Sequence, residues 1–83
     1  MVIYQVVVKT NTQWEEHQDP EIFTFVNLED ARKCYVQQEK KYIKEYNINA
    51  DKWEIEKQHC YFYAYLENSF EYVEIQLYER EVL

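Results

Sequence analysis

Apolar and polar residues alternate along this chain at two different spacings, and the changes of spacing mark the expected elements. Residues 2–9 (VIYQVVVK) and 22–26 (IFTFV) are short runs of β-branched and aromatic residues, which indicate strands. The three valines at positions 6–8 leave both faces of the first run apolar, which favours a central strand. Residues 10–20 are polar and end in an Asp-Pro dipeptide, so we expect an exposed loop there.

The clearest element is an amphipathic helix of about five turns that begins after Asn27. Asn27 is a favoured N-cap residue, and Asp30 stands at the N3 position of an approximate capping box. We expect Asn47 or Asn49 to end the helix in the left-handed conformation that glycine usually adopts. Apolar and aromatic residues gather on one side of this helix and lysines on the other: Leu28, Ala31, Tyr35, Tyr42, Ile43 and Tyr46 against Lys33, Lys40, Lys41 and Lys44.

Residues 52–66 and 70–82 are predicted to form a terminal antiparallel hairpin. The apolar phase reverses across residues 57–59, which indicates a β-bulge or a break in the first arm. A loop of odd length would place a buried residue opposite an exposed one, whereas the two-residue loop Asn68-Ser69 keeps the two faces in phase. That loop pairs Phe62 with Ile75, Ala64 with Val73, and Tyr65 with Tyr72. In the first arm, the buried face is then predicted to carry Cys60, Phe62, Ala64 and Leu66.

These elements predict one domain, residues 1–83, of the α+β class. The expected order is ββαββ, an antiparallel-rich sheet with one amphipathic helix packed on one face. A composition of 47% hydrophobic and 18% aromatic residues is typical of a globular chain and not of a disordered one.

The composition also excludes several kinds of catalytic site. The chain contains no glycine, so it lacks the phosphate-binding P-loop, the GxGxxG dinucleotide turn and the GxSxG nucleophile elbow. The histidines and cysteines (His17, His59, Cys34 and Cys60) have no metal-ligand spacing. His59 and Cys60, as neighbours on the expected strand, should point to opposite faces. We therefore expect no catalytic residues, no metal site and no cofactor.

The net charge of −7 makes a direct nucleic-acid binder or a protein that docks on anionic membranes improbable, since both kinds of binding depend on Lys and Arg. There is no secretory signal, no apolar run of membrane-spanning length and no disulfide framework. We therefore expect a cytoplasmic protein. Acidic residues gather in the terminal part, where residues 48–83 carry eight acidic and three basic side chains.

A candidate partner surface follows from the outward phase of the terminal hairpin. Tyrosines there could pair face to face in a homodimer, in which Glu74 would repel its symmetry mate unless Arg80 or Lys57 compensates. The glutamates are either an ordinary charged exterior or a row of carboxylates that mimics a phosphate backbone. Trp14, in the polar loop, either covers the core or anchors a partner. The full set is Trp14, Glu54, Glu56, Tyr61, Tyr63, Tyr65, Glu71, Tyr72, Glu74, Tyr78 and Glu79.

Two segments carry a resemblance to a known group of proteins. Residues 27–33 (NLEDARK), which open a Tyr-rich helix, and residues 70–79 (FEYVEIQLYE) resemble small acidic proteins encoded in phages and mobile elements of Firmicutes. The resemblance spans residues 21–82 and implies a non-enzymatic accessory protein. The leading expectation is a protein–protein interaction module whose partner is a protein, a basic one if the acids take part. The alternative is an acidic, nucleic-acid-mimicking inhibitor of a host DNA- or RNA-binding or defence protein.

Overall fold

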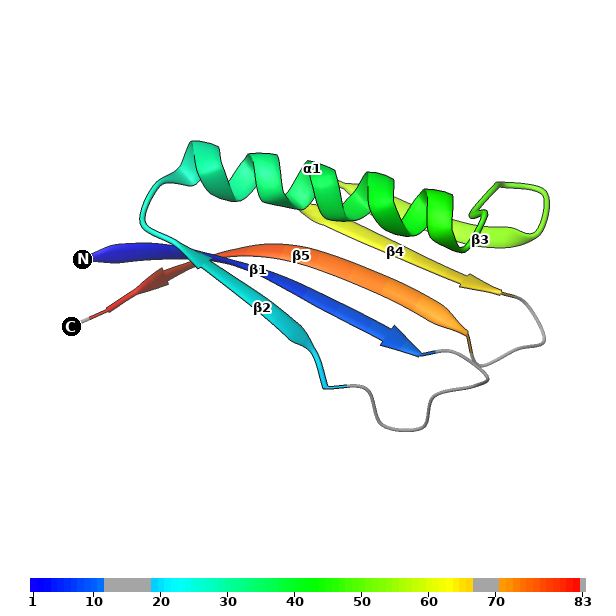
Figure 1. Ribbon diagram of the computed structural model, residues 1–83, viewed down its shortest axis with the longest axis horizontal. Coiled ribbons are helices and arrows are strands. Elements are labelled where there is room, and N and C mark those ends of the chain that lie inside the picture. Colours follow the sequence, from blue (N-terminus) through cyan, green and yellow to red (C-terminus); the bar gives the residue numbers. More distant parts are fainter. Residues whose placement is uncertain (12–18, 67–70, 83) are drawn as a thin grey trace.

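The computed structural model describes residues 1–11, 19–66 and 71–82, and these contain one helix and five strands. In chain order they are β1 (Val2–Asn11), β2 (Glu21–Phe25), α1 (Leu28–Glu45), β3 (Trp53–Gln58), β4 (Tyr61–Leu66) and β5 (Tyr72–Glu81). The strands form a single antiparallel sheet in the order β2-β1-β5-β4-β3, with α1 lying across one side (Figure 1). The α+β class is confirmed.

The predicted ββαββ order is wrong in one respect, because the first arm of the terminal hairpin is two strands. Residues 52–66 contain β3 and β4, which pair with each other from Trp53↔Leu66 to Gln58↔Tyr61. His59 and Cys60 form the turn between them, and Cys60 has a φ of 64°. The carbonyl of Cys60 accepts a hydrogen bond from the N–H of Leu77 at 3.0 Å, which ties this turn to β5. The observed order is therefore ββαβββ.

The reversal of apolar phase at residues 57–59 was the signal of this turn. A two-residue hairpin is usually marked by glycine or asparagine at a positive φ. A cysteine gives no such mark, so the pattern indicated a β-bulge or a break without identifying a turn, and the structure has the break. His59 and Cys60 are consequently turn residues and not neighbours on a strand, and Cys60 is half-buried at the turn instead of lying in the core.

The predicted register of the last two strands is confirmed. Phe62 lies opposite Ile75, Ala64 opposite Val73, and Tyr65 opposite Tyr72. The N–H of Leu66 donates to the carbonyl of Glu71 at 3.1 Å, which continues the ladder toward the connection. The predicted Asn68-Ser69 loop itself lies outside the described residues.

The first strand occupies a central position, as its valine run predicts. β1 pairs with β2 on one side and with β5 along its whole length on the other, from Val2↔Glu81 to Asn11↔Tyr72. The two ends of the chain therefore lie together (Figure 1), and Val82 N–H donates to the Met1 carbonyl at 2.7 Å. Val6 and Val8 come to lie opposite Leu77 and Ile75 beneath the helix.

Both helix ends follow the sequence. The Asn27 side chain accepts hydrogen bonds from the backbone N–H groups of Glu29 and Asp30, at 2.8 and 3.4 Å. At the other end Asn47 adopts a φ of 52°, and Ile48 N–H donates to the Ile43 carbonyl at 2.9 Å. These are the features of a Schellman motif with asparagine in the position that glycine usually fills.

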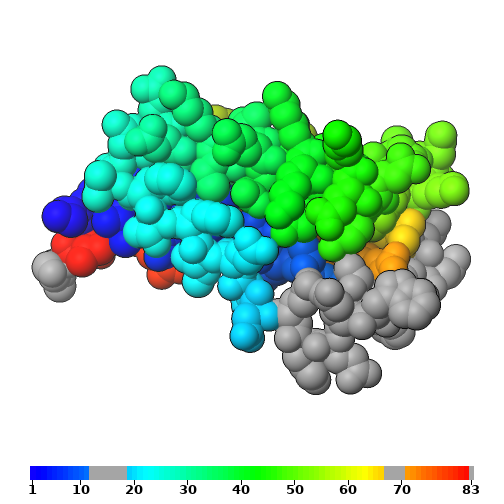
Figure 2. Space-filling view, viewed as in Figure 1, coloured from blue at the N-terminus to red at the C-terminus, as the bar shows by residue number. Residues whose placement is uncertain are grey.

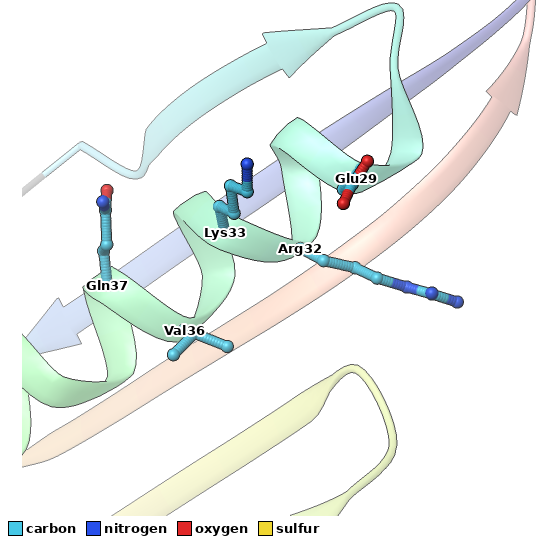
Figure 3. A pocket seen from close by; sticks show the side chains of 5 residues that line it. All are labelled: Glu29, Arg32, Lys33, Val36 and Gln37. Carbon is cyan, nitrogen blue, oxygen red and sulfur yellow. The ribbon is translucent and has the colours of Figure 1, made fainter.

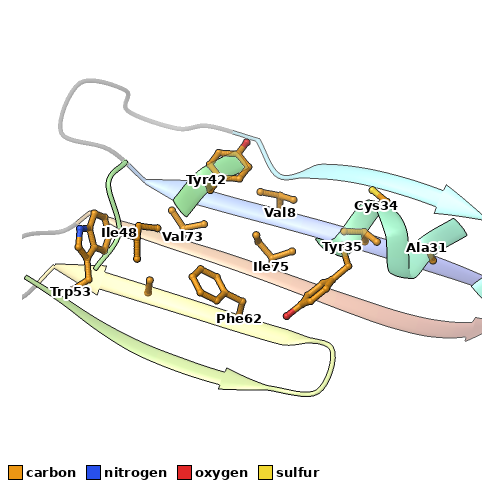
Figure 4. Close-up of a cluster of buried hydrophobic side chains, with 12 residues drawn as sticks. Val8, Ala31, Cys34, Tyr35, Tyr42, Ile48, Trp53, Phe62, Val73 and Ile75 are labelled. Carbon is orange, nitrogen blue, oxygen red and sulfur yellow. The ribbon is translucent and has the colours of Figure 1, made fainter. Parts of the chain in front are cut away.

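The core lies between α1 and the sheet (Figure 4) and runs from Ala31 and Cys34 at one end to Ile48 and Trp53 at the other. Its largest fully buried side chains are Phe62, Ile75, Val6 and Val73. Cys34, which is not among the residues that the sequence pattern places on the apolar side of the helix, is buried with Tyr35. In the space-filling view α1 and β2 adjoin each other, and part of β1 remains visible beside them (Figure 2).

Candidate interaction surface

The sheet has a second face, opposite α1, on which the outward residues of the strands meet. Strand alternation and the observed register place five half-buried tyrosines there, which we call the tyrosine face. No described element covers this face. Its members are Tyr61, Tyr63 and Tyr65 of β4 and Tyr72 and Tyr78 of β5.

Three of these rings pack against one another. The Tyr63 ring centroid lies 5.5 Å from that of Tyr65 and 6.0 Å from that of Tyr72, which is within the range of favourable aromatic pairs. On β5 the Arg80 guanidinium lies over the Tyr78 ring, 5.5 Å from its centroid. The tyrosine rings thus form an amphipathic layer in which neighbouring side chains pack against one another along the sheet surface.

Glu74 stands among these tyrosines, and its compensating charge comes from a residue that the sequence pattern did not suggest. Lys9, directly opposite on β1, places its Nζ atom 4.0 Å from the Glu74 carboxylate. The expected compensating residues do other things, since Arg80 stacks on Tyr78 and Lys57 pairs with Glu39 on the helix side. The carboxylate at the centre of the face is therefore matched by a lysine.

The surroundings of two tyrosine hydroxyls favour their neutral form. Partial burial raises the pKa of Tyr63 and of Tyr61, and the nearby carboxylate of Glu74 raises both further. A neutral phenol both donates and accepts hydrogen bonds. The face can therefore present apolar ring surface together with uncharged polar groups.

Two more candidates, Glu54 and Glu56, border this face. They lie on β3 opposite Tyr65 and Tyr63, and both are exposed. The structure thus brings most of the predicted partner surface together on one side of the sheet: Glu54, Glu56, Tyr61, Tyr63, Tyr65, Tyr72, Glu74 and Tyr78.

The remaining predicted partner residues lie elsewhere. Glu79 is opposite Tyr4, which packs toward the core on the helix side, and Glu71 precedes β5 with the same phase. Trp14 is outside the described residues.

The sequence pattern did not predict the other half of the open face, which β1 and β2 supply, because it gave no pairing of β1 with β5. That half includes Val7 opposite the exposed Ile22, and Gln5, whose side-chain amide donates to the Thr24 hydroxyl.

Away from this face, the described residues include an ion pair on the helix side and a shallow hollow. The Lys57 Nζ atom donates to Glu39 Oε1 at 2.6 Å, between β3 and α1. The hollow lies along the outside of α1 and is lined by Glu29, Arg32, Lys33, Val36 and Gln37, whose side chains diverge (Figure 3). Burial raises the pKa of the Cys34 thiol, which disfavours the reactive thiolate.

Neither metal ligands nor a membrane helix stand out in the part of the chain that the structure describes. Within residues 1–11, 19–66 and 71–82 there is no group of three or more His, Cys, Asp or Glu side chains arranged to hold a metal ion. Among the same residues no helix is both long and apolar enough to cross a membrane. Comparisons of the chain with protein-family models, with curated proteins and with solved structures find no match.

Proposed function

We propose that this protein is a non-enzymatic, cytoplasmic interaction module that binds a protein through the tyrosine face. The observation that supports the proposal is the contiguous layer of Tyr63, Tyr65 and Tyr72 on the sheet face opposite α1. Tyrosine is enriched at protein interfaces because it offers a large rigid area together with a hydroxyl. The resemblance of residues 21–82 to phage and mobile-element proteins accords with an accessory role.

A second copy of the chain is the first partner to consider. Two tyrosine faces related by a two-fold axis would cover each other, and such dimers are the commonest oligomers. With the axis along β5, each Glu74 approaches its mate, and the neighbouring Lys9 offsets this repulsion.

The test compares the wild type with Tyr63→Lys/Tyr72→Lys, which places two cations on the layer. Light scattering should give about twice the 10.4 kDa monomer mass for the wild type and the monomer mass for the variant. Lys33→Glu/Lys40→Glu on the exposed side of α1 is the control and should keep the wild-type mass. If the wild type is monomeric, the tyrosine variant and the lysine control are each used as bait to capture proteins from the host. Partners that the control retains and the tyrosine variant loses would support the proposal, and equal capture by both would reject it.

The acidic inhibitor is the second candidate, favoured by the exposed carboxylates of Glu54 and Glu56. Side chains two residues apart on a strand recur on one face at about 6.7 Å, a spacing that could imitate a row of phosphates. This candidate predicts a basic partner whose binding weakens steeply between about 50 and 300 mM salt. Binding that is indifferent to salt would reject it and leave the tyrosine face as the binding surface.

A further inference from the structure

β3 (Trp53–Gln58) stands at one edge of the sheet, and in the described residues nothing pairs with its outer side. All its residues except Trp53 are exposed. An edge strand presents unpaired backbone N–H and C=O groups that can pair with a further strand. The opposite edge, β2, is less suited to this, since it has five residues, follows Pro20 and leads directly into α1.

On the helix side, β3 carries an uncovered apolar position. Ile55 is 40% exposed, although its partner on β4, Ala64, is fully buried. Val36 of α1 is 43% exposed and points to the side of the helix where the β3–β4 hairpin lies (Figure 3). The Glu39–Lys57 pair joins helix and strand beside them at 2.6 Å. A strand added at this edge would find aliphatic surface on the helix side.

On the other side of the sheet, the same strand carries only acidic and amide residues. Glu54, Glu56 and Gln58 alternate there, and all three are exposed. Residues directly opposite each other on neighbouring strands interact, with opposite charges stabilising and like charges destabilising. The residues of an incoming strand that face Glu54 and Glu56 would therefore be basic.

The same charges disfavour pairing of β3 with β3 of a second copy. In an antiparallel pair that matches like faces, a two-fold axis at Glu54, Ile55 or Glu56 places a glutamate opposite a glutamate: Glu54 against Glu54, Glu54 against Glu56, or Glu56 against Glu56. An axis at Lys57 places Lys57 opposite Lys57 instead, so like charges also meet in that register. A second copy is thus a poor occupant of this edge.

We propose that β3 accepts an extended segment of a partner protein, added antiparallel to the sheet, in which Lys or Arg alternates with aliphatic residues. The basic residues face Glu54 and Glu56, and the aliphatic ones lie beside Ile55 on the helix side. Backbone hydrogen bonds supply the affinity and the alternation supplies the register, as in other cases of strand addition. The strand-addition proposal adds a class of partner to the proposed function. It rests on that function only because it assumes that the ligand is a protein.

The test uses three capped peptides with the whole chain, followed by NMR of the backbone amides. The first peptide alternates Lys and Val over six residues, and the second has the same residues in blocks, three Lys then three Val. The third is the alternating peptide with an N-methyl group on every residue, which keeps the charge and removes the backbone hydrogen-bond donors on both sides of the strand. Strand addition predicts that the alternating peptide perturbs and protects the amides of residues 53–58, with at least about tenfold weaker binding by the other two peptides.

Two variants separate this edge from the tyrosine face. Glu54→Lys/Glu56→Lys should weaken binding of the alternating peptide by about tenfold or more. The neutral changes Tyr72→Ser/Tyr78→Ser, on β5 and separated from β3 by β4, should leave the affinity for that peptide within about twofold. Circular dichroism verifies that both variants are folded. Equal binding by the N-methylated peptide, no binding at all, or perturbations confined to β5 and β1 would overturn the strand-addition proposal. None of these results would reject binding through the tyrosine face, which the mass and capture experiments test separately.

Discussion

Glu39 of α1 and Lys57 of β3 form an ion pair between the helix and the edge strand, with Nζ and Oε1 2.6 Å apart. The Glu39 side chain is only 10% exposed, while that of Lys57 is 60% exposed. The nearly buried carboxylate thus has its cationic partner on the solvent side. The pair fastens the β3–β4 hairpin to the helix at a point where the aliphatic side chains nearby are only half covered.

Replacing Lys57 should lower the free energy of unfolding more than replacing an ordinary surface lysine does. Lys57→Ala leaves the Glu39 carboxylate without its donor, and we expect a loss of about 1–2 kcal/mol in the free energy of unfolding, reduced from the fully buried case because Lys57 reaches solvent. Lys40→Ala, at an exposed helix position, should change stability by less than about 0.5 kcal/mol. Urea denaturation measures both, and equal midpoints would contradict a structural role for the pair.

Two cross-strand neighbours in the core provide a sharper test of the sheet. Phe62 and Ile75 are 2% and 0% exposed and lie opposite each other on β4 and β5. Replacing either with alanine leaves a cavity under α1, so each should lower stability by about 2–5 kcal/mol. Glu54→Ala on the exposed face of β3 should stay within about 0.5 kcal/mol of the wild type. A larger loss for the glutamate would mean that the assigned faces are reversed.

The buried tyrosines should make stability fall at alkaline pH. Burial raises the pKa of Tyr35 to about 12, with smaller contributions from Glu39 and Cys60, and raises that of Tyr42 to about 12, with Glu21 as the next cause. A folded-state pKa above the unfolded value near 10 means that stability is complete below pH 10 and is lost as the pH rises toward 12. At pH 11 the loss should be on the order of 1 kcal/mol for each tyrosine.

Tyr35→Phe separates this effect from general alkaline denaturation. The Tyr35 hydroxyl is buried without a hydrogen-bond partner among the described residues, so its removal should leave stability at pH 7 unchanged or increase it by up to about 1 kcal/mol. The variant should also lose less stability between pH 9 and pH 11 than the wild type. Denaturation curves at the two pH values are the measurement, and an identical slope in both proteins would argue against burial of Tyr35.

The turn between β3 and β4 offers a test of the five-stranded sheet. Cys60 has a φ of 64°, which costs a residue with a side chain about 1 kcal/mol and costs glycine little. Cys60→Gly should therefore raise the free energy of unfolding by up to about 1 kcal/mol, while the β-branched Cys60→Val should lower it. If residues 52–66 formed one bulged strand instead, glycine would weaken it and valine would be tolerated.

The helix and its ends were predictable because their causes are local. The cap at Asn27, the left-handed Asn47 and the side that carries Tyr35 and Tyr42 all depend on residues within a few positions of one another. The register of β4 with β5 was predictable for a related reason, because a slip of one residue would exchange the buried Phe62 and the outward Tyr63.

The position of β1 between β2 and β5 was decided by the tertiary structure. The valines at positions 6–8 indicate a strand with neighbours on both sides, but nothing near them in the chain says that one neighbour comes from residues 72–81. That choice depends on burying β1, β5 and the helix together, a contact across the length of the chain. It determines in turn that Lys9, and not Arg80 or Lys57, meets Glu74.

The turn at Cys60 and the open edge of β3 could not be predicted from the local sequence either. Cys60 carries no intrinsic preference for a positive φ, and it adopts one because β3 must fold back beside β4 and because its carbonyl meets the N–H of Leu77 on β5. The tyrosines and glutamates were visible in the sequence as outward residues. The tyrosines of β4 and the glutamates of β3 meet on a single face because the chain turns at His59 and Cys60. No glycine marks that turn in the sequence, so the arrangement was decided by tertiary contacts.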